Sequence, residues 1–414
     1  MKGIAWFYTI FWIIYFPTCL AFQTFDLADE LLCIILMMYG FTKWTHRRKN
    51  RRIEKEMYQY WGIIGFYTVY SILINITTFR GVYLDFLQQI RPYMVFYMTL
   101  FMAPQFTEKQ KKLIVWSMLA TTVLFVIRTG AIQSYEAGVE QGDLPMVALT
   151  TGMTYFLFMK ESKKNTYIAI AIMLVGLMSG KSKYMGQCVC FIGIVIYLKN
   201  KVNYRNPKVY ALLAILIVAV LFVSWTKFNA YYVEGFEGEA EELAARPATY
   251  KTAFGKILWD YFPFGSGLGS FATAAAAKEY SPLYYKYNLN EIWGMTPDFT
   301  GFMADSFYPS LCEYGVVGIF LFCVFWKRRL KEVQNITDMN HYKMALMSIL
   351  ALAIDSTSNT AYLSGGGMGL FMTLAICLNS NEEEDDDEED DDEENESERP
   401  FQTVRDDYWE YHKS

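Results

Sequence analysis

The chain of 414 residues contains little histidine, cysteine or charge. Its three histidines, His46, His341 and His412, all fall on the side that we assign below to the cytoplasm. Chemistry on the outer face would therefore proceed without histidine. The seven cysteines lie in or at the ends of apolar segments, so the sequence offers no framework of disulfides in an outer loop.

Charged residues make up 19% of the sequence, whereas hydrophobic residues make up 53%. The apolar residues form long stretches that are separated by short charged clusters. A helix needs about 20 apolar residues to span the hydrocarbon core of a bilayer, and several stretches reach that length. The pattern excludes a soluble globular interpretation and predicts an all-α, polytopic membrane protein.

We predict about twelve transmembrane helices. The first apolar stretch has no strong basic region before it and no small-residue cleavage site after it, which indicates a retained helix and not a signal peptide. The predicted helices are 3–22, 28–45, 59–78, 84–105, 113–132, 144–160, 166–180, 184–199, 209–226, 306–326, 343–359 and 361–379.

The positions of lysine and arginine indicate the orientation, because basic residues of short loops stay in the cytoplasm. With both termini inside, 23 of the 34 basic residues before residue 380 fall on the cytoplasmic side. The bases left at or near the outer side are the exceptions that a function has to explain. They include Arg91, Arg128, Lys181, Lys183 and Arg246.

The two ends of the chain differ in charge. Residues 380–414 contain 18 acidic and three basic residues, whereas residues 1–379 contain 34 basic and 25 acidic ones. The formal net charge of −6 therefore conceals a basic body and an acidic tail. We assign residues 1–379 to one integral membrane domain and residues 380–414 to a disordered cytoplasmic tail.

Residues 227–304 form the one long predicted loop, on the outer side, and long loops are commonly functional or disordered. This loop contains too many aromatic residues for a solvated linker, so we expect it to fold over the membrane surface. Apolar residues at three- and four-residue spacing predict an amphipathic helix over 247–261, which is too short to span and would lie at the interface. The glycine-rich segment 264–269 predicts a turn that lets the backbone approach another group closely.

Three carboxylates lie in or beside the last three predicted helices. Asp305 is expected at the outer edge of the tenth helix, and Glu313 about two turns deeper. An ionisable residue at that depth is a functional candidate. Asp305 could instead be the N-cap of the helix. Glu313 and Asp355 could each be the buried partner of a base, and for Glu313 the candidates are Arg91 and Arg128.

Several motifs resemble the bacterial O-antigen ligase and O-antigen polymerase superfamily. With the number of predicted spans and the single large loop, the similarity covers most of residues 59–379. The resemblance implies a metal-independent glycosyltransferase without cofactor, which acts at the periplasmic face of the inner membrane on glycans carried by undecaprenyl pyrophosphate. The motifs are Arg246, the turn at 263–269, Asp305-Ser306-Phe307, Glu313-Tyr314-Gly315-Val316-Val317-Gly318 and the outer turn at 179–184.

The resemblance also implies roles for the outer cations. Arg246 matches the family's loop arginine, and Lys183 stands where the family has a turn arginine, with Lys181 an equal candidate. These residues would bind the departing pyrophosphate, because positive charge is needed where negative charge develops. Arg91 and Arg128 could line the same cavity. The alternatives are that Arg246 caps an interfacial helix or binds lipid head groups, and that the two lysines only extend to the interface.

The ligase branch of this family has a histidine near the start of the tenth helix, taken to deprotonate the acceptor hydroxyl, and Asp305 stands at that place here. A carboxylate whose pKa is raised by partial burial can act as a general base. The missing histidine favours a polymerase of repeat units for O-antigen, capsule or exopolysaccharide over a ligase that transfers finished glycan to lipid A core or another acceptor.

The resemblance implies the lipid-linked glycan, membrane lipids and a chain-length regulator as partners, and no nucleic acid. A transporter or flippase is a further alternative, from another class of protein. It would be expected to contain inverted repeats and broken helices in matching halves, and the sequence contains no convincing repeat.

Overall fold

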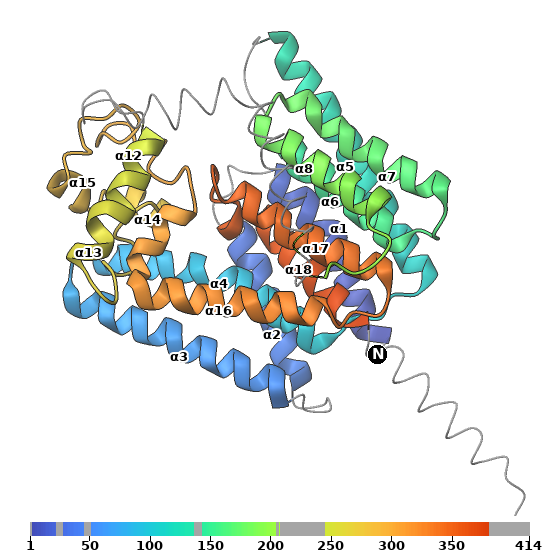
Figure 1. The fold of residues 1–414 in the computed structure, drawn as a ribbon, viewed down its shortest axis with the longest axis horizontal. Helices are drawn as coiled ribbons and strands as arrows, with labels where there is room; N and C mark the ends of the chain where they lie inside the picture. The colour runs from blue at the N-terminus through green and yellow to red at the C-terminus, as the bar shows by residue number, and fades with distance from the viewer. Residues whose placement is uncertain are drawn as a thin grey trace, which may run out of the picture.

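The computed structural model describes residues 2–21, 28–44, 51–135, 143–203, 207 and 245–380. These residues form helices and turns without a named β-strand (Figure 1), which confirms the all-α prediction. The elements are α1 (Lys2–Ala21), α2 (Ala28–Trp44), α3 (Arg51–Ile74), α4 (Phe79–Met102), α5 (Glu108–Tyr135), α6 (Asp143–Phe158), α7 (Lys163–Val175), η1 (Gly176–Ser179), α8 (Ser182–Ile192), η2 (Gly193–Tyr197), α12 (Ala245–Thr252), η4 (Ala253–Ile257), α13 (Leu258–Asp260), α14 (Ala274–Lys278), α15 (Leu283–Lys286), η5 (Tyr308–Tyr314), α16 (Gly315–Val333), α17 (Met339–Asp355), η6 (Ala361–Leu363) and α18 (Gly365–Leu378).

Each predicted helix inside the described residues overlaps an observed helical segment, with ends displaced by up to eight residues, as at α3 (Arg51–Ile74) against the predicted 59–78. Three predicted helices, 166–180, 184–199 and 361–379, each correspond to an α-helix joined to a short 3-10 or π-helix. The predicted helix 209–226 lies outside the described residues. The predicted helix 306–326 is divided into a 3-10 helix, η5, and the α-helix α16. The division falls at Gly315, where φ is 60° and a Cβ atom would lie 2.3 Å from the backbone nitrogen of Gly265. A close approach of the glycine-rich turn therefore accounts for the break.

Two helical segments among the described residues are long and apolar enough to cross a membrane, judged by length and composition: Glu108–Gly130 and Tyr308–Val333. Four shorter helical segments are also apolar, namely Gly3–Tyr15, Leu144–Phe158, Ser182–Tyr197 and Gly365–Leu378. The structure thus gives fewer clear candidate spans than the sequence predicts. The four shorter segments, of which Ser182–Tyr197 is α8 continued by η2, fall below the length of a clear span.

The core of the bundle lies where α4, α17 and α18 meet. Helix α4 packs against α2, α3 and α18, and α17 packs against α18 and α8. In Figure 1, α17 and α18 lie between the group α5–α8 and the layer formed by α3, α4 and α16. The ring centres of Phe96 on α4 and Phe371 on α18 lie 6.2 Å apart in this core. The fully buried side chains of the two helices are large and apolar, and include Met94, Phe96, Met98, Leu370, Phe371 and Met372.

Residues 245–304 fold into a unit of their own at one end of α3, α4 and α16 (Figure 1). Elements α12, η4 and α13 form one continuous helical segment, close to the amphipathic helix predicted over 247–261. The prediction that the aromatic loop folds is therefore confirmed for this part, whereas residues 227–244 lie outside the described residues. The unit has its own buried cluster, which includes Ala248, Ala253, Ile257, Phe271, Ala276, Tyr284, Met295 and Met303.

Candidate active site

Arg246 and Asp305 form an ion pair at the edge of the loop unit. Arg246 is the second residue of α12, and its Nη2 donates to Oδ2 of Asp305, which lies in the turn just before η5. The side chains are 20% and 25% exposed. The pair is therefore partly shielded from solvent but still open on one side. A charge-assisted hydrogen bond in such a position is stronger than one on the open surface.

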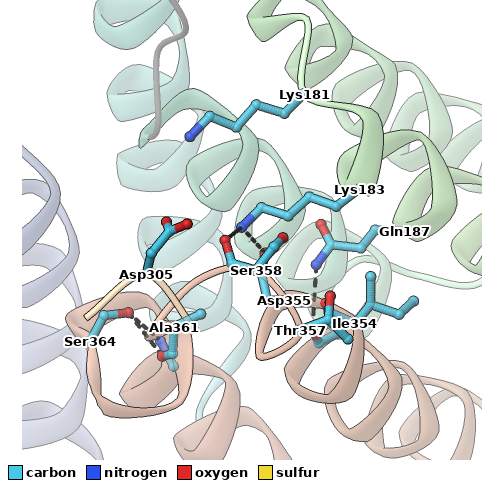
Figure 2. A network of polar contacts seen from close by, with 12 residues as sticks. Lys181, Lys183, Gln187, Asp305, Ile354, Asp355, Thr357, Ser358, Ala361 and Ser364 are labelled. Carbon is cyan, nitrogen blue, oxygen red and sulfur yellow. Dashed lines mark hydrogen bonds and ion pairs between the residues drawn. The ribbon is translucent and has the colours of Figure 1, made fainter. Parts of the chain in front are cut away.

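Two lysines approach the same place from the turn between η1 and α8. Lys183 Nζ lies 3.0 Å from Oδ1 of Asp355 and donates to the carbonyl oxygen of Ser358 at 3.4 Å. Figure 2 shows Lys181 and Lys183 extending toward the space beside Asp305. Gly180, with φ 71°, ends η1 in the left-handed region and reverses the chain, so that both lysines lie at the start of α8.

Hydrogen bonds to backbone carbonyl groups at the end of α17 hold α12 and the segment around η5 in place. The Tyr250 hydroxyl on α12 donates to the carbonyl oxygen of Thr357 at 2.8 Å. The backbone N–H of Phe307 donates to the carbonyl oxygen of Ser356 at 3.1 Å, and the Tyr308 hydroxyl donates to that of Ala353 at 2.9 Å. The end of α17 therefore serves as a common support for the helix with Arg246 and the turn with Asp305.

The environment of Asp305 changes its acidity. Burial is the largest influence on the pKa of Asp305 and raises it. Arg246 opposes the rise most, followed by Lys183 and Lys181. The net effect is a pKa above the ordinary value for aspartate. Such a carboxylate is a better proton acceptor than an exposed one, and nearby cations still keep the charged form accessible.

We call Arg246, Lys181, Lys183, Asp305 and Asp355 the cationic cluster. It contains three basic and two acidic side chains, so it has one more positive than negative charge when all are ionised. Its members come from α12, the start of α8, the turn before η5 and the end of α17. The arrangement can bind an anionic group with several negative oxygens and offers a carboxylate beside it.

Asp305 is not the N-cap of a helix. The residue at the N-cap of η5 is Phe307, which makes no side-chain capping bond. The alternative prediction, that Asp305 is an N-cap, is therefore wrong. It required a helix that begins at Ser306, whereas η5 begins at Tyr308. The prediction that Asp355 is the buried partner of a base is confirmed, because Asp355 pairs with Lys183.

Glu313 lies outside the cationic cluster and does not have the partner that we predicted. It is fully buried, and its Oε1 accepts from the backbone N–H of Phe271 at 2.7 Å. Its carboxyl group lies near that of Asp85 on α4, and among the described residues no ion pair joins it to an arginine. Asp85 in turn accepts from the backbone N–H of Gly269 at 3.0 Å. The two acids thus anchor the loop unit to α4.

Asp85 was not singled out in the sequence. A signal was present, because Asp85 is a carboxylate inside a largely apolar helix, the feature that drew attention to Glu313. Its role depends on a contact with residues about 200 positions away, which no local pattern reports.

The glycine-rich turn approaches the protein's own backbone. Gly265, Gly267 and Gly269 all have positive φ, at 84°, 81° and 70°. A Cβ atom at Gly269 would lie 2.6 Å from the carbonyl oxygen of Gly81. The close approach predicted for this turn is thus to the start of α4 and, through Gly265, to the start of α16. Glycine is needed here for packing and for the left-handed conformation.

The two remaining predicted arginines have other neighbours. Arg91 is buried on α4, and its Nη1 lies 3.1 Å from Oε1 of Glu30 on α2. Arg128 is exposed on α5, with its guanidinium 5.7 Å from the ring centre of Phe125 on the same helix. The structure therefore groups Arg246, Lys181 and Lys183 around Asp305 and accounts for Arg91 and Arg128 by different contacts.

Metal ligands do not gather in the part of the chain that the structure describes, where no three His, Cys, Asp or Glu side chains are placed to hold an ion. The six cysteines whose side chains the structure describes are free thiols. No protein-family model and no curated protein sequence matches the chain. The functional interpretation therefore rests on the residues and geometry of the cationic cluster.

Proposed function

We propose that this protein is a membrane glycosyltransferase that polymerises repeat units carried by undecaprenyl pyrophosphate, as a member of the O-antigen ligase and polymerase superfamily. The observation that carries the proposal is the cationic cluster: Arg246 and two lysines converge from separate chain segments on one partly buried aspartate of raised pKa. A pyrophosphate leaving group and a hydroxyl acceptor require this combination of positive charge and a base.

The pyrophosphate of the lipid-linked glycan binds Arg246 and Lys183, with Lys181 adding charge at the entrance. Arginine suits this role because its planar donors match phosphate oxygens, whereas lysine acts as a point charge. The incoming phosphate competes with Asp305 for Arg246 and with Asp355 for Lys183. Binding therefore releases the Asp305 carboxylate toward the acceptor.

Asp305 then takes the proton of an acceptor hydroxyl, and the hydroxyl oxygen forms a bond to the anomeric carbon of the donor. The bond between that carbon and the pyrophosphate oxygen breaks with both electrons going to the oxygen. Undecaprenyl pyrophosphate leaves with its new negative charge held by Arg246 and Lys183. A single displacement of this kind inverts the configuration at the anomeric carbon.

The topology is part of the same proposal. About twelve helices would span the inner membrane of a bacterium, with both termini in the cytoplasm and the loop unit and cationic cluster on the periplasmic face. The basic residues of short loops favour this orientation. The acidic tail at 380–414 would then lie in the cytoplasm, and a chain-length regulator would be a partner in the membrane.

The test replaces the gene in its native strain with Arg246→Gln or Asp305→Asn and separates surface glycan by size. We expect each variant to lower the amount of polymer about 100-fold, the cost of removing one donor or base from such a site. Arg80→Gln is the matched control, because Arg80 is 69% exposed and pairs with Glu279 in the same region. Full-length polymer from both site variants, at wild-type protein levels, would refute the assignment.

Deletion of the gene separates the proposed polymerase from a ligase. Without a polymerase, single repeat units still reach the acceptor, whereas without a ligase, polymer stays on its lipid carrier. Transport of the lipid-linked glycan by purified protein, with no glycosyl transfer, would instead indicate a flippase.

A further inference from the structure

A groove of about 570 Å³ runs between α3, α4 and the helical segment formed by η5 and α16. Helices α3 and α16 lie side by side in Figure 1, and the groove follows them. Its lining is largely apolar and aromatic, and includes Tyr60, Ile63, Tyr93, Leu321, Phe322 and Phe325. It is separate from the cationic cluster, since none of the five cluster residues lines it.

The two ends of the groove differ in polarity. One end is formed by Phe307, Leu311 and Tyr314 of the segment around η5. The other end is formed by Glu56, Arg328 and Arg329, near the last turns of α16. An apolar channel with a charged group at one end has the shape of a site for an amphiphile with one long chain.

The charge at the polar end is positive. Arg329 is buried and lies 2.5 Å from Glu56 and 2.9 Å from Glu332, so its charge is compensated. Arg328 is exposed, and among the described residues it makes no ion pair. Lys327 is exposed beside it. An anionic head group placed at this end would meet uncompensated positive charge.

The groove also opens toward apolar surface. Phe66 of α3, which lines the groove, is 47% exposed, and Val69 and Phe320 of the bordering helices are 58% and 65% exposed. A Cβ atom built on Gly62, which lines the groove, has no other atom within 4 Å. The groove is therefore accessible from an apolar environment and has free space along α3.

We propose that the groove binds one acyl chain of an anionic phospholipid whose phosphate lies at Arg328. This proposal depends on the proposed function in one respect only, namely that the protein lies in a membrane. The lipid is distinct from the glycan carrier, because that carrier's pyrophosphate belongs at Arg246. Arg328 lies thirteen residues along α16 from Gly315, roughly 20 Å at 1.5 Å per residue.

The experiment compares lipids retained by purified full-length protein, using native mass spectrometry after equimolar exposure to phosphatidylglycerol and phosphatidylcholine. We expect wild-type protein to retain phosphatidylglycerol preferentially. Gly62→Trp fills the groove and should lower that retention about tenfold. Arg328→Glu should lower it about tenfold as well and abolish the preference over phosphatidylcholine, because reversing one charge near an anionic head group changes the affinity by about this factor.

The controls use positions with the same chemistry outside the groove. Gly65 also has no atom within 4 Å of a built Cβ but does not line the groove, so Gly65→Trp should retain the lipid normally. Lys331→Glu, an exposed reversal on the same helix, should keep the preference. Unchanged retention in Gly62→Trp and Arg328→Glu would overturn the proposal. So would undecaprenyl phosphate displacing phosphatidylglycerol from wild-type protein, since the groove would then serve the carrier. The size of the surface glycan tests the polymerase assignment, and lipid retention tests the groove, so either proposal can fail without the other.

Discussion

Two charged clusters lie toward opposite ends of the segment formed by η5 and α16, and they differ in balance. The cationic cluster precedes η5 and has three basic side chains for two acidic ones. The second, which we call the balanced cluster, consists of Arg52, Glu56, Arg329 and Glu332, two bases and two acids. Counting the named side chains alone, the cationic cluster has a net charge of +1 and the balanced cluster a net charge of zero.

The clusters also differ in how their key arginine is held. Arg329 is 1% exposed, pairs with two glutamates and lies 5.2 Å and 5.3 Å from the ring centres of Phe96 and Phe325. Arg246 is 20% exposed and pairs with Asp305. Arg329 is buried, and two carboxylates balance its charge, so it serves the packing of α16 against α3 and α4. A partly open arginine such as Arg246 is suited to binding, because an incoming anion can replace Asp305 at its guanidinium group.

The largest expected effect comes from removing the central charge of the balanced cluster. Arg329→Gln leaves Glu56 and Glu332, 13% and 16% exposed, without their main partner. Breaking a buried ion pair in this way costs about 3–5 kcal/mol. We expect a corresponding loss in the free energy of unfolding, measured by denaturant titration in mixed micelles.

Arg52→Gln is the matched control, because Arg52 belongs to the same cluster but is 65% exposed. An exposed pair contributes about 0.2–1 kcal/mol, so this variant should be nearly as stable as wild type. Equal losses from Arg52→Gln and Arg329→Gln would contradict the view that burial, not the number of charges, gives the balanced cluster its role.

The second effect is on catalysis, in the cationic cluster. Lys183→Gln removes one cation from the proposed pyrophosphate site, and we expect the rate of glycan transfer by purified protein to fall about 100-fold. Lys183→Arg should retain most of the rate, since the charge remains and arginine also binds phosphate. Lys183→Arg should also retain stability, whereas Lys183→Gln leaves the Asp355 side chain, which is 8% exposed, without its cation and should lower the free energy of unfolding. Rates are therefore compared per amount of folded protein. A rate loss that is the same in both would indicate that lysine geometry, and not charge, is what matters.

A smaller effect is expected at Asp355, which contacts Lys183 and not the substrate. Asp355→Asn keeps the shape but removes the charge that positions the ammonium group at 3.0 Å. We expect KM for the lipid-linked donor to change by about tenfold or less, with a smaller change in kcat, because Asp355 positions a binding group. A loss in kcat as large as that of Asp305→Asn would mean that Asp355 itself serves the chemistry.

The sequence predicted the helices well because apolar run length is a local property. Helices α1 and α2 each begin and end within one residue of their predicted bounds. The break at Gly315 was not predictable, because it depends on contact with the turn at Gly265. Long-range packing of this kind decides where a continuous apolar run is divided.

Four of the predicted site residues, Arg246, Lys181, Lys183 and Asp305, lie together in the structure. Arg91, Arg128 and Glu313 have other contacts. Arg246, Lys183 and Asp305 were named from motifs and from their position outside the basic-inside pattern. Glu313 was wrongly expected to pair with an arginine: its Oε1 accepts from the backbone N–H of Phe271, and the nearby ionisable side chain is Asp85. Charge complementarity is a poor guide here, since two buried carboxyl groups can share a hydrogen bond when one holds a proton. Their pairing depends on how the loop unit meets α4.

The smallest expected effect is a shift in pH dependence when Lys181 loses its charge. Ionised Asp305 is the proposed base, so transfer should rise with pH through the pKa of Asp305, which burial has raised. Lys181 lowers that pKa, least among the three cations. Lys181→Gln should therefore raise it, and the acidic limb should move to higher pH by well under one unit, since a partly exposed charge is screened.

The measurement is the initial rate of glycan transfer from pH 4 to pH 8 at saturating donor, a range that covers ordinary and raised carboxylate pKa values. Lys251→Gln, an exposed change on α12, is the control and should leave the midpoint unchanged. A shift of the acidic limb to lower pH in Lys181→Gln would contradict the sign, because loss of a nearby positive charge can only make a carboxylate harder to ionise. It would mean that the group titrating on that limb is a cation and that Asp305 is not the base.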